Sequence, residues 1–382
     1  MRLNDCHNVE DFRKLAKDRI PSSLFHYIDG GADDENSLRR NTSAFEEFDL
    51  IPNGLADVDN IDLSTTILGQ KVSSPLFLAP TGMSRLFNHD GERAAALAAE
   101  NYNQYYSLST LSSVSIEEIG ALTSSPKMFQ IYIHKDRELT YELIERCKKA
   151  NFNSLCLTID TIVAGNRERD LKTGMTMPPK FTISSLLGFA MRPRWVYNYF
   201  THEAFELANL AGKTKKGGKE SIPVIDYVNS QFDTNLCWDD AQKAIESWGG
   251  PFAIKGVMSV DDAKRSVDVG ASAIMVSNHG GRQLDSSPAP FDLLSDIADA
   301  VGDKIEIICD GGIRRGTHIL KALALGADAC SIGRPYLYGL AAGGQKGVES
   351  VLAKFQAELT RNMMLMGINN LSQLDLTRVR KR

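Results

Sequence analysis

The sequence predicts an α/β protein built on a (β/α)8 TIM barrel, with an N-terminal helical extension and a long insertion after the fourth strand. Eight short apolar runs, rich in isoleucine, leucine and valine, have the composition of strands buried on both faces. Helix-like segments separate them, as a parallel barrel requires. An open doubly wound sheet is the alternative, and it is disfavoured because no G-x-G-x-x-G motif follows an early strand.

The apolar runs define the predicted strands in chain order. They lie at residues 75–80, 105–110, 127–133, 154–160, 251–256, 273–278, 305–311 and 328–333. The clearest helices lie at residues 91–102, 136–150, 259–270 and 315–326. Ser259, followed by acidic residues, is typical of a helix start, and Gly270 and Gly326 are typical of helix ends.

A single domain is expected to account for residues 1–382. Residues 1–70 predict a helical preface, in which Pro21 can open a helix. Residues 71–360 hold the barrel, including an insertion over roughly 161–235 whose length suits a lid, an interface or a mobile loop. Residues 361–382 form a C-terminal tail, and we interpret its final RVRKR as a solvated end.

The composition is that of an ordinary globular protein, with 43% hydrophobic and 24% charged residues. The 43 basic and 48 acidic residues give a net charge of −5, so we expect no nucleic-acid partner. The six cysteines form no C-x-x-C pair, which predicts no metal site and a reducing, cytoplasmic compartment. No signal peptide and no membrane-spanning stretch is expected.

Polar and charged residues gather where the predicted strands end. In a parallel barrel these ends meet at one mouth, where barrel enzymes place their chemistry. The residues at or just beyond the eight ends are, in order, Pro80, Thr81 and Gly82; Ser109; Gln130 and Tyr132; Thr158, Asp160 and Arg167; Lys255; Ser277, His279 and Arg282; Asp310, Gly311, Gly312 and Arg314; and Gly333 and Arg334. A barrel with a purely structural role has little use for such a set.

The last two strand ends predict a phosphate site. Gly311 and Gly312 allow backbone N–H groups to approach an anion closely, and Gly333 adds a second open backbone. Arg314 and Arg334 supply guanidinium groups beside these glycines. Glycines that only form tight turns are the alternative, which two glycine sites on adjacent strands disfavour.

His279 is the best candidate for a catalytic base, because an unperturbed histidine titrates near neutrality and this one follows a strand directly. A lone histidine is more often structural, but Asp160 is placed to orient it. Arg167 and Arg282 are a potential fork for a substrate carboxylate, or else they pair with surface acids. Lys255 is either half of a buried ion pair or a cation that stabilises an anionic ring.

These motifs together resemble the FMN-dependent L-2-hydroxy-acid dehydrogenases and oxidases, which include glycolate oxidase, respiratory L-lactate dehydrogenase, flavocytochrome b2 and mandelate dehydrogenase. The segment SNHGGRQLD (277–285) resembles the active-site signature of that family. Further blocks in the family's order are LFHYIDGGADDE, LAPTGM, FQIYIHKDR, LTIDT, IKGV and DGGIRRGTHILKALALGADACSIGR. The resemblance covers essentially the whole chain and is least secure near residues 175–235.

The resemblance implies a role for each matching position. Tyr27, Arg167 and Arg282 would bind the substrate carboxylate, Tyr132 would contact the hydroxyl, and His279 would take a proton with Asp160 raising its basicity. Lys255 would stabilise the reduced flavin. The residues implied to line FMN are Pro80, Thr81, Gly82, Ser109, Gln130, Thr158 and Ser277, and those implied to hold its ribityl chain and phosphate are Asp310, Gly311, Gly312, Arg314, Gly333 and Arg334.

The resemblance leaves the substrate and the electron acceptor open. L-lactate and a quinone are favoured, because Gly82, LFHYIDGG and SLRRN are closer to the respiratory dehydrogenases. The alternatives are an oxidase that passes electrons to O2 and releases H2O2, as in the glycolate and lactate oxidases, and an L-mandelate dehydrogenase. Leu111 stands where glycolate oxidases carry tryptophan. An FMN-dependent isomerase barrel or a non-catalytic flavin protein would not need His279 with both arginines.

The insertion is relevant to where in the cell the protein is expected to lie. Residues 180–219 mix aromatic side chains with arginines and lysines, a composition that suits the surface of a membrane. A lid or a subunit contact is the alternative. We therefore expect a cytoplasmic protein, either free or peripheral on the inner membrane, that assembles as a homo-oligomer, in this family a tetramer.

Overall fold

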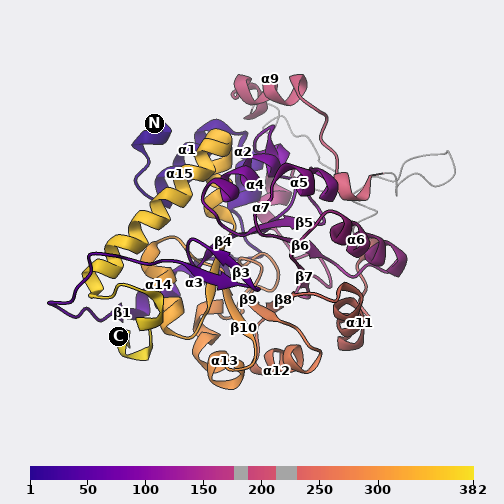
Figure 1. Cartoon of the computed structure of the whole chain (residues 1–382). Coiled ribbons are helices and arrows are strands. Elements are labelled where there is room, and N and C mark those ends of the chain that lie inside the picture. Colours follow the sequence, from indigo (N-terminus) through magenta and orange to yellow (C-terminus); the bar gives the residue numbers. More distant parts are fainter. Residues whose placement is uncertain (176–187, 212–229) are drawn as a thin grey trace.

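The computed structural model describes residues 1–175, 188–211 and 230–382. Eight parallel strands form a closed barrel in the order β10-β11-β4-β5-β6-β7-β8-β9, which confirms the predicted TIM barrel (Figure 1). The strands are β4 (Leu76–Thr81), β5 (Tyr106–Ser109), β6 (Lys127–Ile131), β7 (Ser154–Thr158), β8 (Phe252–Val257), β9 (Ala273–Ser277), β10 (Glu306–Asp310) and β11 (Ala329–Ile332). Each coincides with one of the eight predicted apolar runs.

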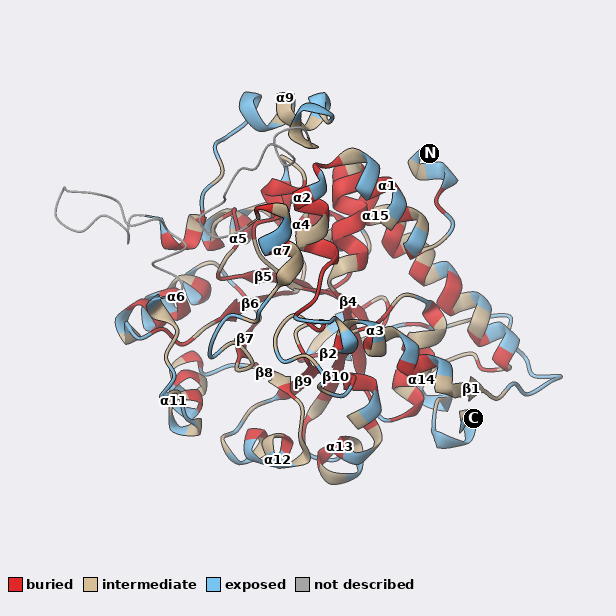
Figure 2. Ribbon diagram, turned by 180° about the vertical axis from the view of Figure 1, so that it is seen from behind, coloured by how far each residue is buried: buried red, intermediate tan, exposed pale blue. Residues whose placement is uncertain are grey.

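Helices surround the barrel and bury their apolar faces against it (Figure 2). They are α4 (Gly91–Asn101), α5 (Ile116–Leu122), α6 (Arg137–Lys149), α11 (Trp238–Trp248), α12 (Val260–Asp268), α13 (Leu294–Val301), α14 (Gly316–Ala324) and α15 (Arg334–Met366). Ser259 caps α12 as predicted, since its hydroxyl accepts from the backbone N–H of Asp262 at 3.1 Å. Gly270 and Gly326 follow their helices with left-handed backbone, φ 84° and 98°.

The N-terminal segment is helical only in its first part. Helices α1 (Val9–Arg19), α2 (Ser22–Asp29) and α3 (Asn36–Ser43) are followed by three short strands, β1 (Phe48–Leu50), β2 (Thr65–Ile67) and β3 (Gln70–Val72). The prediction of a helical preface to residue 70 therefore extends too far. β2 and β3 form a hairpin whose Ile67, Leu68 and Val72 are buried against side chains from the first residues of the barrel strands. The hairpin therefore covers the N-terminal end of the barrel.

The C-terminal tail is solvated at its end, as expected, but it also forms regular structure. α15 continues to Met366, and β12 (Val379–Lys381) pairs antiparallel with β1. The side chain of Arg382 donates to Asp49 at 2.7 Å. The tail is exposed, but it closes a small sheet with the N-terminal segment.

Two further helices lie in the described part of the insertion, α7 (Glu168–Thr173) and α9 (Pro193–Thr201). α9 stands apart from the barrel at the edge of the molecule (Figure 1). Lys213, Lys215, Lys216 and Lys219, which contributed to the membrane prediction, lie outside the described residues.

Candidate active site

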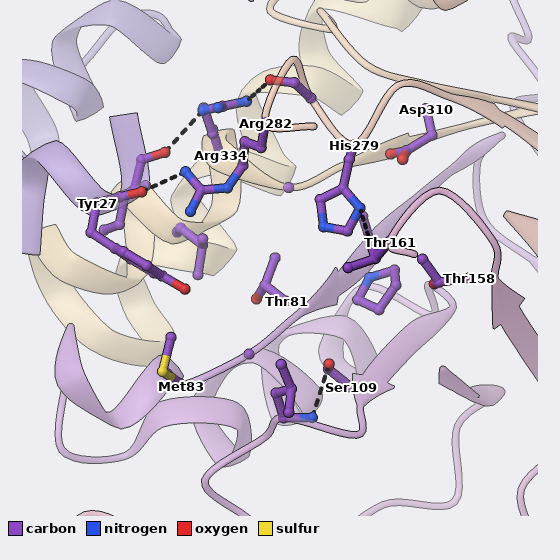
Figure 3. A pocket seen from close by; sticks show the side chains of 18 of the residues that line it. Tyr27, Thr81, Met83, Ser109, Thr158, Thr161, His279, Arg282, Asp310 and Arg334 are labelled. Atoms are coloured by element: carbon purple, nitrogen blue, oxygen red, sulfur yellow. Dashed lines mark hydrogen bonds between the residues drawn. The ribbon is translucent and has the colours of Figure 1, made fainter. Parts of the chain in front are cut away.

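A cavity of about 410 Å³ opens at the C-terminal ends of the barrel strands (Figure 3). Seven of the eight strands contribute to its wall, the segment directly after β9 contributes His279, and α2 contributes Tyr27. The predicted site residues on this wall are Tyr27, Pro80, Thr81, Gly82, Ser109, Gln130, Tyr132, Thr158, Arg167, Lys255, His279, Arg282, Asp310, Gly311, Gly312, Arg314, Gly333 and Arg334. The other two, Asp160 and Ser277, lie directly behind it and contact wall residues.

His279 follows β9 and points into the cavity (Figure 3). Its backbone is left-handed, φ 57°, a strained conformation for a residue with a side chain and one that concentrates at functional sites. Its Nδ1 lies 2.8 Å from Asp160 Oδ1. Because a carboxylate only accepts hydrogen bonds, the neutral ring carries its proton on Nδ1, which leaves the Nε2 lone pair free to take a proton.

The surroundings keep His279 neutral and Asp160 ionised. Burial lowers the pKa of His279 below its ordinary value, and the attraction of Asp160 only partly offsets this effect. Burial raises the pKa of Asp160, but His279 and Lys255 outweigh it and bring that pKa down to about 2. Thr161 Oγ1 also donates to Asp160 Oδ1 at 2.9 Å. A neutral base beside a fixed carboxylate can accept a proton, and the carboxylate stabilises the imidazolium that results.

The pH dependence of the reaction follows from this pair. The neutral imidazole persists below pH 6.5, so the rate at which His279 can take a proton from a bound molecule should stay high until the pH falls below the ordinary range of a histidine. In Asp160→Asn the carboxylate that favours the imidazolium is lost, so the pKa of His279 falls further. The variant should react on the order of 10²-fold more slowly, with its acidic limb at lower pH. A pH profile of kcat/KM checks both effects, and an unmoved limb would argue against the pairing.

Two guanidinium groups flank the histidine. Arg282 Nη1 donates to the backbone oxygens of Tyr27 at 2.7 Å and Gly30 at 3.0 Å, and its Cζ lies 4.8 Å from the centre of the Tyr27 ring. Burial and the neighbouring Arg167 lower the pKa of Arg282 to about 9, so it remains a cation at neutral pH. Arg167 Nε is buried without a hydrogen-bond partner, and neither guanidinium forms a salt bridge with any described residue. This arrangement suits a bound carboxylate.

Tyr132 completes the substrate side. Burial and Asp160 raise the pKa of its phenol to about 12, so the hydroxyl keeps its proton and can donate it to an oxygen in the cavity. Its ring packs edge to face against Phe232, with the centroids 5.8 Å apart.

Lys255, in β8, places a cation in the cavity wall. Its Nζ donates to Ser277 Oγ at 2.9 Å and lies 3.1 Å from Asp310 Oδ2. Asp310 also accepts from Ser277 at 2.7 Å and from Ser331 at 2.5 Å. Burial disfavours the ammonium ion, but Asp310 and Asp160 outweigh this and raise the pKa of Lys255. The ion-pair alternative for Lys255 is therefore confirmed. Because Lys255 also lines the cavity, its role beside an anionic ring stays a prediction.

The predicted phosphate end has an open backbone. Gly311 and Gly312 have φ of 144° and 74°, and Gly333 lies at the start of α15, whose N-terminal dipole favours an anion. Arg314 lies on the same wall. Arg334 is engaged elsewhere, since it donates to the backbone oxygens of Ile28 at 2.9 Å, Gly280 at 2.8 Å and Gly30 at 2.7 Å. Three of its five N–H groups are thereby used, and two remain for a phosphate.

Gly312 has no room for a side chain. A Cβ atom there would overlap the backbone oxygen of Asn41, and the left-handed backbone adds strain. Gly312→Ala should displace this loop and weaken, about 10-fold, binding of the FMN that the family resemblance implies. Gly270→Ala is the matched control, because its φ of 84° is similar but no described atom lies within 4 Å of the added carbon. FMN titration followed by flavin fluorescence compares the two, and equal affinities would contradict the assignment.

The structure adds wall residues that sequence reasoning missed. Thr161 follows Asp160 directly, so the rule that found the strand ends also covers it. Asp170 lies in α7, three residues after Arg167, and burial raises the pKa of its carboxyl to about 6. Part of the wall is apolar and consists of Met83, Phe87, Leu111, Leu171, Met175, Leu207 and Phe232. The family resemblance singled out only Leu111 among them, and no signal in a single sequence points to the other six side chains.

The fold and the site suit a flavin-dependent barrel oxidoreductase. Glycine backbone is open where a phosphate could bind, a buried cation and hydrogen-bonding groups line the cavity, and a candidate base shares that cavity with two guanidiniums. The chain belongs to the FMN-dependent dehydrogenase family, whose model matches residues 16–381. It is thus an FMN-dependent enzyme that oxidises 2-hydroxy acids.

Similar proteins cover nearly the whole chain. A putative L-lactate dehydrogenase of Mycobacterium tuberculosis is 39% identical over 98% of this chain and 89% of its own. An L-lactate oxidase of a Nostoc species is 41% identical over 96% of each chain. Among solved structures, the monotopic membrane protein (S)-mandelate dehydrogenase matches with a TM-score of 0.94 and 33% identity, over 99% of this chain and 100% of that one.

Proposed function

We propose that this enzyme oxidises L-lactate to the 2-keto acid and passes the electrons to a quinone. The observation that carries the oxidation is the His279–Asp160 pair, at 2.8 Å, beside two guanidiniums that form no salt bridge with any residue in the described ranges. A small 2-hydroxy acid offers a carboxylate for the guanidiniums and a hydroxyl for the histidine. The apolar wall at Leu111 and Leu207 suits the methyl group of lactate.

Each side chain has a role in this proposal. Arg167, Arg282 and Tyr27 bind the carboxylate and fix the substrate's orientation. Tyr132 donates to the substrate hydroxyl oxygen, and His279 Nε2 takes the hydroxyl proton. Asp160 stabilises the imidazolium. FMN, when bound, would supply the acceptor for the α-hydrogen of the substrate together with its two electrons.

The same proposal assigns residues to FMN. Lys255 stabilises the negative charge of the reduced ring, and Asp310 with Ser277 holds that ammonium in place. The residues proposed to line the ring are Pro80, Thr81, Gly82, Ser109, Gln130 and Thr158, and those proposed for the phosphate end are Gly311, Gly312, Arg314, Gly333 and Arg334.

Anaerobic rapid mixing tests the substrate and the acceptor separately. L-lactate should bleach the bound flavin with a higher kcat/KM than glycolate or L-mandelate. A soluble quinone analogue should then reoxidise it faster than air-saturated buffer does. A higher kcat/KM for L-mandelate would make L-mandelate the substrate in place of L-lactate. Reoxidation by O2 at the same rate as by the quinone would favour an oxidase that releases H2O2.

We further propose that α9 contacts a membrane surface from the cytoplasmic side. Tyr197 and Phe200 are 67% and 78% exposed on this helix, and Met191 just before it is 69% exposed. No described helix is long and apolar enough to cross a membrane. A monotopic relative supports the proposal. The expected homotetramer stays a prediction that sedimentation equilibrium tests.

Replacing both Tyr197 and Phe200 by serine should weaken binding to lipid vesicles about 100-fold or more, since each buried aromatic side chain contributes roughly 1.5–3 kcal/mol. Leu365→Ser with Leu376→Ser is the control, because these side chains are 68% and 59% exposed on another part of the chain. Vesicle co-sedimentation measures the difference. Equal loss in both variants would show that α9 has no special part in binding.

A further inference from the structure

A second cavity, of about 430 Å³, lies beside the first, between α9, the segment after β4 and a bend in α15. α15 bends at Gly343 and Gly344, whose backbone angles are not helical. Phe87 belongs to the walls of both cavities. The residue roles proposed for the reaction in the first cavity do not involve the second cavity.

Phe87 connects the two cavities through a short stack of rings. It is 2% exposed, and its ring stacks on that of Tyr27, with the planes 25° from parallel and the centroids 6.3 Å apart. Tyr27 in turn lies under the guanidinium of Arg282. A molecule in the second cavity would therefore be separated from the substrate side of the active site by side-chain rings and not by a barrel wall.

The outer wall of the second cavity is aromatic and held in place. Trp195 and Tyr199 of α9 stack with centroids 5.0 Å apart and planes 17° from parallel. The Trp195 indole N–H donates to the backbone oxygen of Leu86 at 2.9 Å, which anchors α9 to the segment that carries Phe87. A flat conjugated ring fits between such side chains.

Hydrogen-bond donors surround these rings. Arg19, Arg194 and Lys346 line the cavity and form no hydrogen bond or ion pair through their side chains with the residues that the structure describes. His89 also lines this cavity, and its Nδ1 is buried without a hydrogen-bond partner. Unpaired cations near an aromatic wall can donate to the carbonyl oxygens of a ring and stabilise negative charge that arrives on them.

We propose that this second cavity binds the quinone that accepts the electrons, with its ring between Phe87 and Trp195 and its oxygens facing the cationic side chains. The inference rests on the proposed function, in which a quinone is the acceptor. The reaction balances without another reagent: the hydroxy acid loses two electrons and two protons to become the keto acid, and the quinone gains both to become the quinol. The exposed Tyr197 and Phe200 place this cavity next to the proposed membrane contact.

The test compares Trp195→Leu with Tyr197→Leu in the FMN-loaded enzyme, without membranes. Tyr197 is on the same helix but is not part of the cavity wall. Equilibrium dialysis measures binding of a water-soluble short-chain ubiquinone analogue, and rapid mixing measures its reoxidation of the reduced enzyme. Trp195→Leu should weaken binding and raise the KM for the quinone about 10-fold, while Tyr197→Leu matches the unmodified enzyme. Flavin reduction by the hydroxy acid, measured on the same samples, reports on the first cavity alone.

The possible failures are distinguishable. If the unmodified enzyme is reoxidised by the quinone and Trp195→Leu matches it in dialysis and in rate, the second cavity is not the quinone site but the acceptor assignment stands. If the unmodified enzyme neither binds the quinone nor is reoxidised by it, the proposed acceptor is wrong and this proposal falls with it. Binding of a short-chain anionic phospholipid in place of the quinone would assign the cavity to a lipid headgroup and overturn the proposal.

Discussion

His279→Gln is expected to slow the reduction of bound FMN by L-lactate about 10²–10⁴-fold, the usual contribution of a general base. Glutamine is close to histidine in size and can still hydrogen-bond Asp160, but it cannot take a proton at neutral pH. Anaerobic rapid mixing, followed at the flavin absorption band, measures the rate. Binding of a non-reacting dicarboxylate such as oxalate should change little, because Arg167 and Arg282 remain.

A second histidine provides the control. His134 is buried, 3% exposed, and burial lowers the pKa of its ring to about 4, but it does not line the cavity. L-lactate should therefore reduce the FMN of His134→Gln at the same rate as the FMN of the unmodified enzyme. If His279→Gln also reacted at that rate, another group would have to be the base.

Lys255→Met is expected to destabilise the fold by about 3–5 kcal/mol, because it leaves the Asp310 carboxylate buried without its cation. Lys255 is 4% exposed and Asp310 is 7% exposed, so water cannot replace the lost partner. Urea unfolding followed by circular dichroism measures the loss, with FMN in excess for every sample. The rate of FMN reduction should also fall, since the negative charge on the reduced ring is no longer offset.

The double variant Lys255→Met with Asp310→Asn separates charge from shape. It removes the unpaired carboxylate and keeps its size, so much of the stability should return while FMN reduction stays slow. A single variant as stable as the unmodified protein would mean that the ion pair contributes little to the fold.

The barrel was predictable because each strand is buried on both faces, which leaves an uninterrupted apolar run such as 273–278 in the sequence. The hairpin of β2 and β3 was missed, because each strand has only three residues and no alternation can be recognised over that length. The pairing of β12 with β1 joins residues 49 and 380 in register, a separation that a local pattern cannot reveal.

The active site also has features that the sequence could predict and features that it could not. Strand ends converge by topology, so His279, Lys255 and Asp310 were found from their positions alone. What Arg334 binds depends on which carbonyl groups the chain brings beside it, and these come from α2 and the loop after β9. The second cavity depends on α9 packing against the segment after β4, through one indole hydrogen bond that no motif encodes.

The most direct test of the central claim is the anaerobic addition of L-lactate to the purified, FMN-loaded enzyme. We predict that the yellow colour bleaches with one pyruvate formed for each flavin reduced. D-lactate should not bleach it at a comparable rate, and His279→Gln should slow the change about 10²–10⁴-fold. A flavin that no L-2-hydroxy acid reduces, or one that the His279 variant reduces as fast as the unmodified enzyme, would contradict it.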